Sequence, residues 1–538
     1  MSKSLSSSSN LSNSNTKTRS NEEADGIELK KCTSDASINN ERMFASLEEL
    51  MTYIGSRYPH FRKTVLPIVL VYTFLYFFSR FLSILEQMKA LRAAKNDEYF
   101  YSKCLAQTSD DSLKVVESAD FMVHRVPSWE LSIVINAFLM FAFTTVSPRK
   151  LVLCSLAIIS CCYFVMAHFP AQMQMSTFLS QILTEIYRMT ALVTIAESVP
   201  KYHRMPALVL LEMAATIARL VAVTFVRLPA DISLDLSYCF EIFGFLTLVL
   251  AFFTFYTFND SLYSLLARSK TAEMQSRVTE VFRHSAIRLA PDAVIDQIAF
   301  ENFENNENAI EILTRTLKTF KLIQEVLVCG LLSGACLAVN AFMEAEIDKH
   351  AEVFFFENAL VAPVSFTAAT VLISVFAVLL PRHRILPVII IVPLLFFAAS
   401  VMFVIPTVYK TYDKCSKHWV VQDAVFPYYL VVGVFTSALT DVITFFVRVH
   451  LLEVMPVLIR TAILAVLYFL QYSFDGNVRE LYSTNSVGGS AMLILISVIS
   501  MLVLLITPRK RNDMNVYFCE YTRNDKKRSI PPAPEIVK

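Results

Sequence analysis

The chain has 538 residues, of which 55% are hydrophobic and only 18% charged, and its formal net charge is +1. Soluble proteins have about 25% charged residues, so this composition excludes an ordinary soluble protein and requires lipid to cover much of the apolar surface. The balanced charge and the lack of a basic motif give no reason to expect a nucleic-acid partner. We therefore expect a multi-pass membrane protein.

The N-terminus, SKSLSSSSNLSNSN, is rich in Ser and Asn, which is typical of a disordered tail rather than of a cleavable signal peptide. Beyond it, the apolar segments are long. The hydrocarbon core of a bilayer is about 30 Å thick and takes about 20 apolar residues per helix. Because backbone groups in lipid must be hydrogen-bonded within the segment, the spans are predicted to be helices. We predict twelve of them, at 64–85, 129–147, 151–169, 174–198, 206–226, 236–258, 320–343, 355–379, 385–406, 426–449, 456–474 and 489–507.

Basic residues are concentrated in one set of loops. SPRK (147–150), KYHR (201–204), PRHR (381–384) and PRKR (508–511) lie on one side of the predicted topology, whereas the loops on the other side have few cations. Positive charges in short loops favour the cytoplasmic side. Both termini are therefore expected to be cytoplasmic.

The pattern E-x-x-P-x-x-x-R occurs twice, each time after a long apolar segment: Glu197, Pro200 and Arg204, and then Glu453, Pro456 and Arg460. SPRK and PRHR are also placed equivalently, after the second and eighth spans. Equivalent motifs in equivalent loops predict a duplicated six-helix unit, and two such halves form the all-α, twelve-helix fold of the major facilitator superfamily. The predicted organisation is a tail, a first half, a cytoplasmic linker with short helices, a second half and a basic tail, at 1–45, 46–258, 259–319, 320–507 and 508–538.

The two junction motifs have two interpretations. Glu197 and Glu453 end predicted helices, and Arg204 and Arg460 begin the next ones within reach of a glutamate. Such Glu–Arg pairs would hold the two halves together on the cytoplasmic side and break when that side opens. Alternatively, these residues only mark solvated helix ends.

The same residues carry a family resemblance. TIAESVPKYHR and LLEVMPVLIR resemble the helix 4–5 and helix 10–11 junctions of the organic cation and anion transporter family, a branch of the major facilitator superfamily. SLEELMTYIGSRYPHFRK (46–63) and FNDSLYSLLARSKTAEMQSRVTEVFRHSA (258–286) are similar to its segments before helix 1 and after helix 6. The resemblance implies alternating-access transport of a small organic ion at the plasma membrane, with a cavity lined by helices 1, 4, 7 and 10. The sequence does not disclose the oligomeric state, and a monomer is expected.

Other features support a second hypothesis. The helix 2–3 loop, FAFTTVSPRK (141–150), has only Arg149 and Lys150 of the family pattern G-x-L-x-D-R-x-G-R-K, and Arg149 is retained as a candidate gating residue. The chain has only 9 Gly, against an average near 7%. Glycine allows helices to bend and cross closely. These departures favour a non-transporting receptor or scaffold that keeps the fold.

Several charged residues fall within predicted spans, where each costs at least about 2.5–3.5 kcal/mol and so should face protein or water. At about 1.5 Å per residue, Glu185 and Arg219 are expected at equal depth, which predicts an intramembrane pair. Arg188 and Asp441 are also expected at equal depth, one in each half, which predicts a pair that responds to gate and substrate. A static ion pair is the alternative in both cases.

The expected solute site contains Arg80, Arg188 and Asp441. The resemblance also implies a polar position in the middle of helix 11, where this chain has Gln471 and Tyr472. Arg80 and Arg188 favour an organic anion.

No pattern for an enzyme or a cofactor is present. The ten cysteines show no metal-ligand spacing, and the sequence has no Walker motif, nucleophile elbow or HExxH. We therefore expect neither catalysis nor a cofactor. Cys104 and Cys415 fall in predicted extracellular loops, where a disulfide between them is one possibility.

Overall fold

A computed structural model describes the following parts of the chain: residues 64–81, 146–169, 172–227, 236–268, 326–336, 351–379, 385–412, 419–422, 424–455 and 460–465, with short pieces at 270–278, 339–343, 467 and 495–502. The predicted tails fall outside them, as do residues 129–145 and most of the last two predicted spans.

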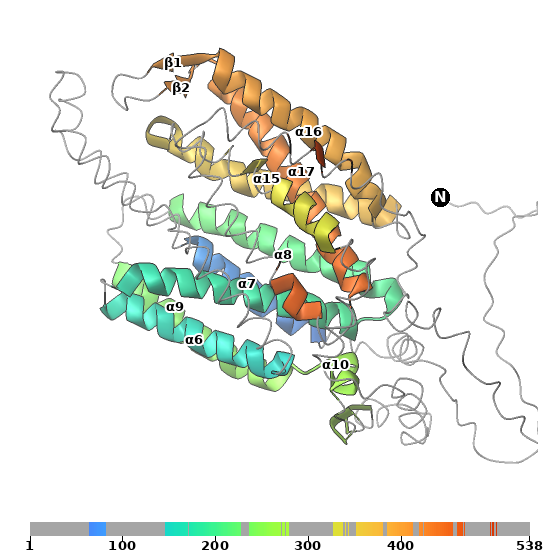
Figure 1. Ribbon diagram of the computed structural model, residues 1–538. Coiled ribbons are helices and arrows are strands. Elements are labelled where there is room, and N and C mark those ends of the chain that lie inside the picture. The colour runs from blue at the N-terminus through green and yellow to red at the C-terminus, as the bar shows by residue number, and fades with distance from the viewer. Residues whose placement is uncertain are drawn as a thin grey trace, which may run out of the picture. The chain divides into compact units, whose positions relative to one another are not determined.

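The first half of the chain contributes long helices, at Thr64–Phe81, Pro148–His168 (α6), Met173–Ser198 (α7), Lys201–Arg227 (α8) and Leu236–Thr257 (α9) (Figure 1). Helix α6 begins where the sequence dictates: Pro148 occupies the first turn, and the Ser147 hydroxyl accepts a hydrogen bond from the backbone N–H of Lys150 at 3.4 Å. A short helix, α10 (Leu262–Ala267), follows α9.

The second half contributes helices at Val326–Cys336, Ala351–Leu379 (α15), Ile385–Val408 (α16) and Phe426–Val454 (α17). Two short antiparallel strands, β1 (Lys410–Tyr412) and β2 (Trp419–Val421), join α16 to α17. The strands lie between two predicted spans, in a loop for which no regular structure was expected. Among the described residues, five helices are long and apolar enough to cross a membrane: Thr64–Phe81, Pro148–His168, His203–Val223, Ser237–Thr257 and Phe426–Leu452.

The packing of the helices reflects the duplication. Helix α6 packs against α7 in the first half, and α16 packs against α17 in the second. These are the third and fourth spans of each predicted half. Helix α8 also packs against α15, which joins the two halves.

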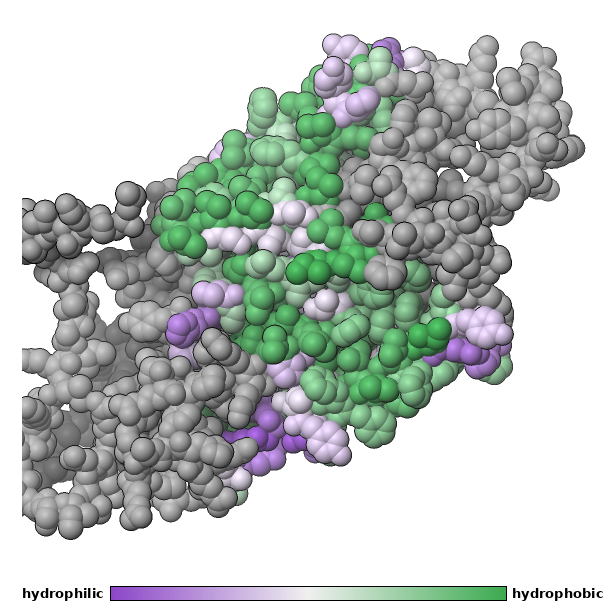
Figure 2. Space-filling view, turned by 180° about the vertical axis from the view of Figure 1, so that it is seen from behind, coloured by the Kyte–Doolittle hydropathy of each residue, from purple (hydrophilic) through white to green (hydrophobic). Residues whose placement is uncertain are grey.

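The surface is suited to lipid. Figure 2 shows hydrophobic side chains over most of the described part of one face. Along α9 the exposed side chains are almost all apolar, among them Ile242, Phe245, Phe252 and Tyr256. Burying these groups in acyl chains is favourable at about 25 cal/mol per Å², so lipid around α9 stabilises it.

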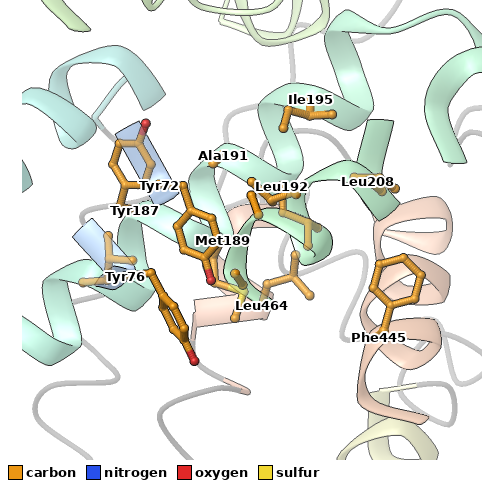
Figure 3. Close-up of a cluster of buried hydrophobic side chains, with 14 of the residues drawn as sticks. Tyr72, Tyr76, Tyr187, Met189, Ala191, Leu192, Ile195, Leu208, Phe445 and Leu464 are labelled. Carbon is orange, nitrogen blue, oxygen red and sulfur yellow. The ribbon is translucent and has the colours of Figure 1, made fainter. Parts of the chain in front are cut away.

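One buried cluster contains residues of both halves. Figure 3 draws part of it, with Tyr72, Tyr187 and Leu192 from the first half and Phe445 and Leu464 from the second. Tyr187 is fully buried, and its hydroxyl donates to the carbonyl of Ile68 at 3.3 Å. The polar groups described below are therefore held by a packed apolar core.

Glycine is rare, but Gly244 has a clear role in α9. A Cβ atom at this position would lie 3.2 Å from the Phe164 ring of α6, and the Gly244 carbonyl accepts a hydrogen bond from the Ser160 hydroxyl at 2.7 Å. Glycine therefore favours the close crossing of α6 and α9, and a larger residue would require the Phe164 ring to shift.

Candidate functional site

A buried salt bridge joins α7 to α8. Nη2 of Arg188 lies 2.9 Å from each carboxylate oxygen of Glu212, and Nη1 lies 3.6 Å from Oε2 of Glu185. The side chains of Arg188 and Glu212 are only 10% and 5% exposed. The charge of Arg188 is therefore neutralised by acids of its own half.

This pairing corrects two predictions, Glu185 with Arg219 and Arg188 with Asp441. The cause is the start of α8, which lies at Lys201 rather than at 206, with Pro206 inside the helix. That change places Arg219 about 7.5 Å further from the start of its helix than expected. Glu212, eleven residues after Lys201, thus matches the depth of Arg188, ten residues before the end of α7.

Arg219 lies against aromatic rings from two other helices. Its Cζ atom is 3.7 Å from the ring centre of Phe366 in α15 and 5.2 Å from that of Tyr76. Its Nε donates a hydrogen bond to the Tyr76 hydroxyl, which also accepts one from Nε of Arg80 at 3.3 Å. Within the described part of the chain, no carboxylate forms an ion pair with Arg219. Stacking leaves the in-plane N–H groups of the guanidinium available to a ligand.

Asp441 lies midway along α17, in the other half. It lies within electrostatic range of Arg219, Glu212, Arg188 and Arg448. No described side chain donates a hydrogen bond to its carboxylate or pairs with it directly. We call the whole group the central seam: Tyr72, Tyr76, Arg188, Glu212, Arg219, Phe366 and Asp441.

Buried polar atoms without a hydrogen-bond partner among the described residues lie in the central seam and next to it. They include the Tyr72 hydroxyl, which interacts electrostatically with Arg188 and Glu185, and the polar atoms of Ser333 and Asn340. Ser333 is three residues before Cys336 in the sequence and Asn340 is four residues after it, and Cys336 is in electrostatic range of Asp441. Buried polar groups usually form hydrogen bonds with protein, water or a ligand, so these atoms indicate a polar region between the helices.

A second cluster lies at the end where α7 stops, which we call the basic end. Nη1 of Arg460 lies 2.7 Å from Oε1 of Glu197, and both side chains are 3% exposed. The other carboxylate oxygen of Glu197 accepts a hydrogen bond from the hydroxyl of Ser261, just before α10. The ion pair therefore connects the first half to the second, and the hydrogen bond from Ser261 attaches the linker to it.

The two junction motifs repeat one contact. Nη2 of Arg204 donates to the carbonyl of Val199 at 3.4 Å, and Nη2 of Arg460 donates to that of Met455 at 3.2 Å. Val199 and Met455 both directly precede the proline of their motif. The sequence repeat is thus a structural repeat. The Glu453 side chain lies outside the described residues.

Arg149 belongs to the basic end too. Its backbone N–H donates to Oδ1 of Asp260 at 2.8 Å, and its Nη2 donates to the carbonyl of Phe255 at 2.7 Å. Nearby, burial lowers the pKa of the Arg268 guanidinium, although Asp260 and Glu197 act in the opposite direction. The start of α6 and the segment after α9 are therefore at the same end.

Four predicted residues, Gln471, Tyr472, Cys104 and Cys415, lie outside the described residues. In the described part of the chain, no three His, Cys, Asp or Glu side chains are arranged to hold a metal ion.

Comparison with solved structures shows the fold. The chain is similar to the proton:xylose symporter XylE bound to 6-bromo-6-deoxy-D-glucose, with a TM-score of 0.56, 14% identity and coverage of 83% of this chain and 96% of that one. A double tryptophan mutant of XylE gives 0.56 at 16% identity, covering 86% and 98%. The inward-open xylose transporter XylE from E. coli gives 0.52 at 14% identity, covering 86% and 98%. The chain has the major facilitator fold. No family model and no curated protein matches it.

The major facilitator fold brings together several residues that the sequence did not single out. Glu212, Phe366 and Ser261 each contact a predicted site residue. Glu212 was detectable as a charge within a span, but Phe366 and Ser261 had no distinguishing signal in a chain with 42 Phe and a Ser-rich composition.

Proposed function

We propose that this protein is a secondary transporter, which moves a small organic solute by alternating access between its two halves. The observation that carries the proposal is the buried ion pair between Glu197 and Arg460. It joins the two halves at one end of the bundle, so that end opens only if the pair separates. Major facilitator proteins bind their solutes between the halves and move one half against the other.

The contacts around this pair make separation feasible. After it breaks, Glu197 keeps the hydrogen bond from Ser261, and Arg460 keeps the one to the Met455 carbonyl, within its own half. A charged group that retains a partner avoids much of the cost of an unpaired buried charge. The pair is thus able to act as a reversible latch.

We propose an organic ion as the solute, with an anion favoured. Arg188 was expected to bind it, but Glu212 and Glu185 neutralise that side chain. Arg219 and Arg80 support the anion instead. Both donate to the hydroxyl of Tyr76, so two positive charges lie close together there. The basic end is proposed to face the cytoplasm of the plasma membrane, since it carries the Lys- and Arg-rich loops.

Uptake by the purified full-length chain in proteoliposomes tests this function. We expect a panel of labelled organic anions, cations and neutral sugars to contain a solute that accumulates. Glu197→Arg should abolish uptake, and adding Arg460→Glu should restore part of it by reversing the pair. Glu273→Gln is the matched control, because Glu273 forms an exposed pair with Lys270 outside the latch. If no compound accumulates with correctly folded protein, the receptor or scaffold hypothesis replaces transport.

A further inference from the structure

The central seam contains one base and one acid that the ion pairs of the fold leave unused. Arg188 is engaged by Glu212 and Glu185. Arg219 and Asp441 do not pair directly with each other or with any other described side chain. Charged groups inside a membrane are costly and normally pair or serve a ligand. Two opposite charges that lie in electrostatic range of each other without a direct ion pair therefore suit a ligand that carries both signs.

The base is oriented for a carboxylate. Phe366 covers one face of the Arg219 guanidinium at 3.7 Å, and Tyr76 accepts the hydrogen bond from Nε. No hydrogen bond to a described residue uses the two terminal nitrogens of Arg219, and their planar geometry matches the two oxygens of a carboxylate. Arg80, which donates to the same tyrosine, adds positive charge on this side.

The acid comes from the opposite half. Asp441 lies on α17, and the charges that act on it are those of Arg219, Glu212, Arg188 and Arg448. Cys336 also lies in its electrostatic range. The uncommitted carboxylate is able to accept hydrogen bonds from an ammonium group.

We propose that the solute is a small zwitterion, with its carboxylate bound by Arg219 and its ammonium group bound by Asp441. The inference rests on the proposed transport function and defines the solute class at the same seam. A zwitterion would connect the two halves through its two charges, so binding would favour the closed arrangement of the seam. The free polar atoms of Tyr72, Ser333 and Asn340 would provide further hydrogen bonds.

Matched trios of probes test the charge requirement on the full-length chain. Each trio has a zwitterion, its N-acetyl anion and its amide cation, and L-phenylalanine and 6-aminohexanoate provide two different charge separations. Binding is measured as the shift of the thermal unfolding midpoint in detergent, and transport as uptake into proteoliposomes. We expect at least one zwitterion to bind roughly 10- to 100-fold more tightly than both of its singly charged derivatives, the effect of losing a hydrogen bond to a charged group.

Two variants assign the charges to their sites. Asp441→Asn should remove the preference for the zwitterion over its N-acetyl anion, and Arg219→Gln should remove the preference over its amide cation. Glu241→Gln, which removes an exposed acid near His168 in another part of the fold, should leave both preferences unchanged. Arg219→Lys, which keeps the charge without the planar fork, should weaken both the zwitterion and the anion.

The results distinguish this inference from transport itself. If an anion, cation or sugar is transported and no zwitterion competes with it, the zwitterion site is wrong while transport stands. A zwitterion preference that survives in both Asp441→Asn and Arg219→Gln also overturns the assignment. If nothing binds or accumulates, the inference and the proposed function fail together.

Discussion

Helix α7 takes part in two buried ion pairs of similar chemistry but different connectivity. Arg188, in the middle of α7, pairs with Glu212 of α8, so both partners belong to the first half. Glu197, near its end, pairs with Arg460 of the second half. In the proposed alternating-access movement, the first pair would be carried along intact and the second would have to break. Position along a single helix therefore separates a structural pair from a pair suited to gating.

The central pair should produce the largest loss of stability. Arg188→Met leaves Glu212 and Glu185 buried without their base, and breaking a buried pair costs about 3–5 kcal/mol. The variant is expected to lose most of its folded, monodisperse protein in detergent, measured by size-exclusion chromatography. Adding Glu212→Met should recover part of the folding, because apolar replacement of a buried pair is often neutral, while Glu185 still lacks its base. A stable Arg188→Met with normal uptake would contradict a structural role.

The latch pair should lose function more than stability. In Arg460→Ala, Glu197 keeps the hydrogen bond from Ser261, so we expect a cost near the lower limit, about 3 kcal/mol. Without the pair the basic end should open readily, which gives folded protein with at least about tenfold slower accumulation. Thermal unfolding and uptake by the same preparation measure the two effects. Equal losses of folding in Arg460→Ala and Arg188→Met would remove the distinction between the pairs.

The sequence predicted much of this architecture because membrane thickness fixes helix length. The expected span 174–198 is observed as Met173–Ser198, and 385–406 as Ile385–Val408. The repeated E-x-x-P-x-x-x-R predicted that both junctions have the same structure, and the equivalent contacts of Arg204 and Arg460 show this.

The sequence could not predict which charged residues form ion pairs with one another. Depth along a helix follows from residue number. A five-residue error at the start of α8 was therefore enough to place Arg219, rather than Glu212, at the depth of the charged residues of α7. The direction in which a side chain points depends on helix rotation, which packing against other helices sets. The contact of Arg219 with Phe366 joins residues far apart in the chain, and no local pattern encodes it.

Ser261 offers a smaller change at the basic end. Its hydroxyl donates to Glu197 and also accepts the backbone N–H of Ser264 at 3.0 Å, which caps α10. Ser261→Ala should therefore cost about 1–2 kcal/mol, the usual effect of losing an N-cap. It should also slow reopening and reclosing of the latch, because Glu197 loses the partner that it keeps when the pair separates. Chemical unfolding and the rate of solute exchange test this, with Ser264→Ala, which keeps the backbone donor, as the control. Unchanged exchange in Ser261→Ala would exclude the linker from the latch.

The smallest effect is expected from a neutral contact between the halves. The hydroxyls of Thr216 in α8 and Thr370 in α15 are 2.7 Å apart, close to the central seam. Thr216→Val and Thr370→Val should each cost about 1 kcal/mol, and the double variant little more than either, because each single change leaves one buried hydroxyl without its cross-half partner. The hydroxyl of each threonine also contacts a carbonyl of its own helix, so neither becomes fully unsatisfied. If the contact forms only while the halves are closed on this side, a double-mutant cycle on uptake rate should show coupling. Additive effects in that cycle would mean that this contact, like the Arg188 pair, persists through the movement.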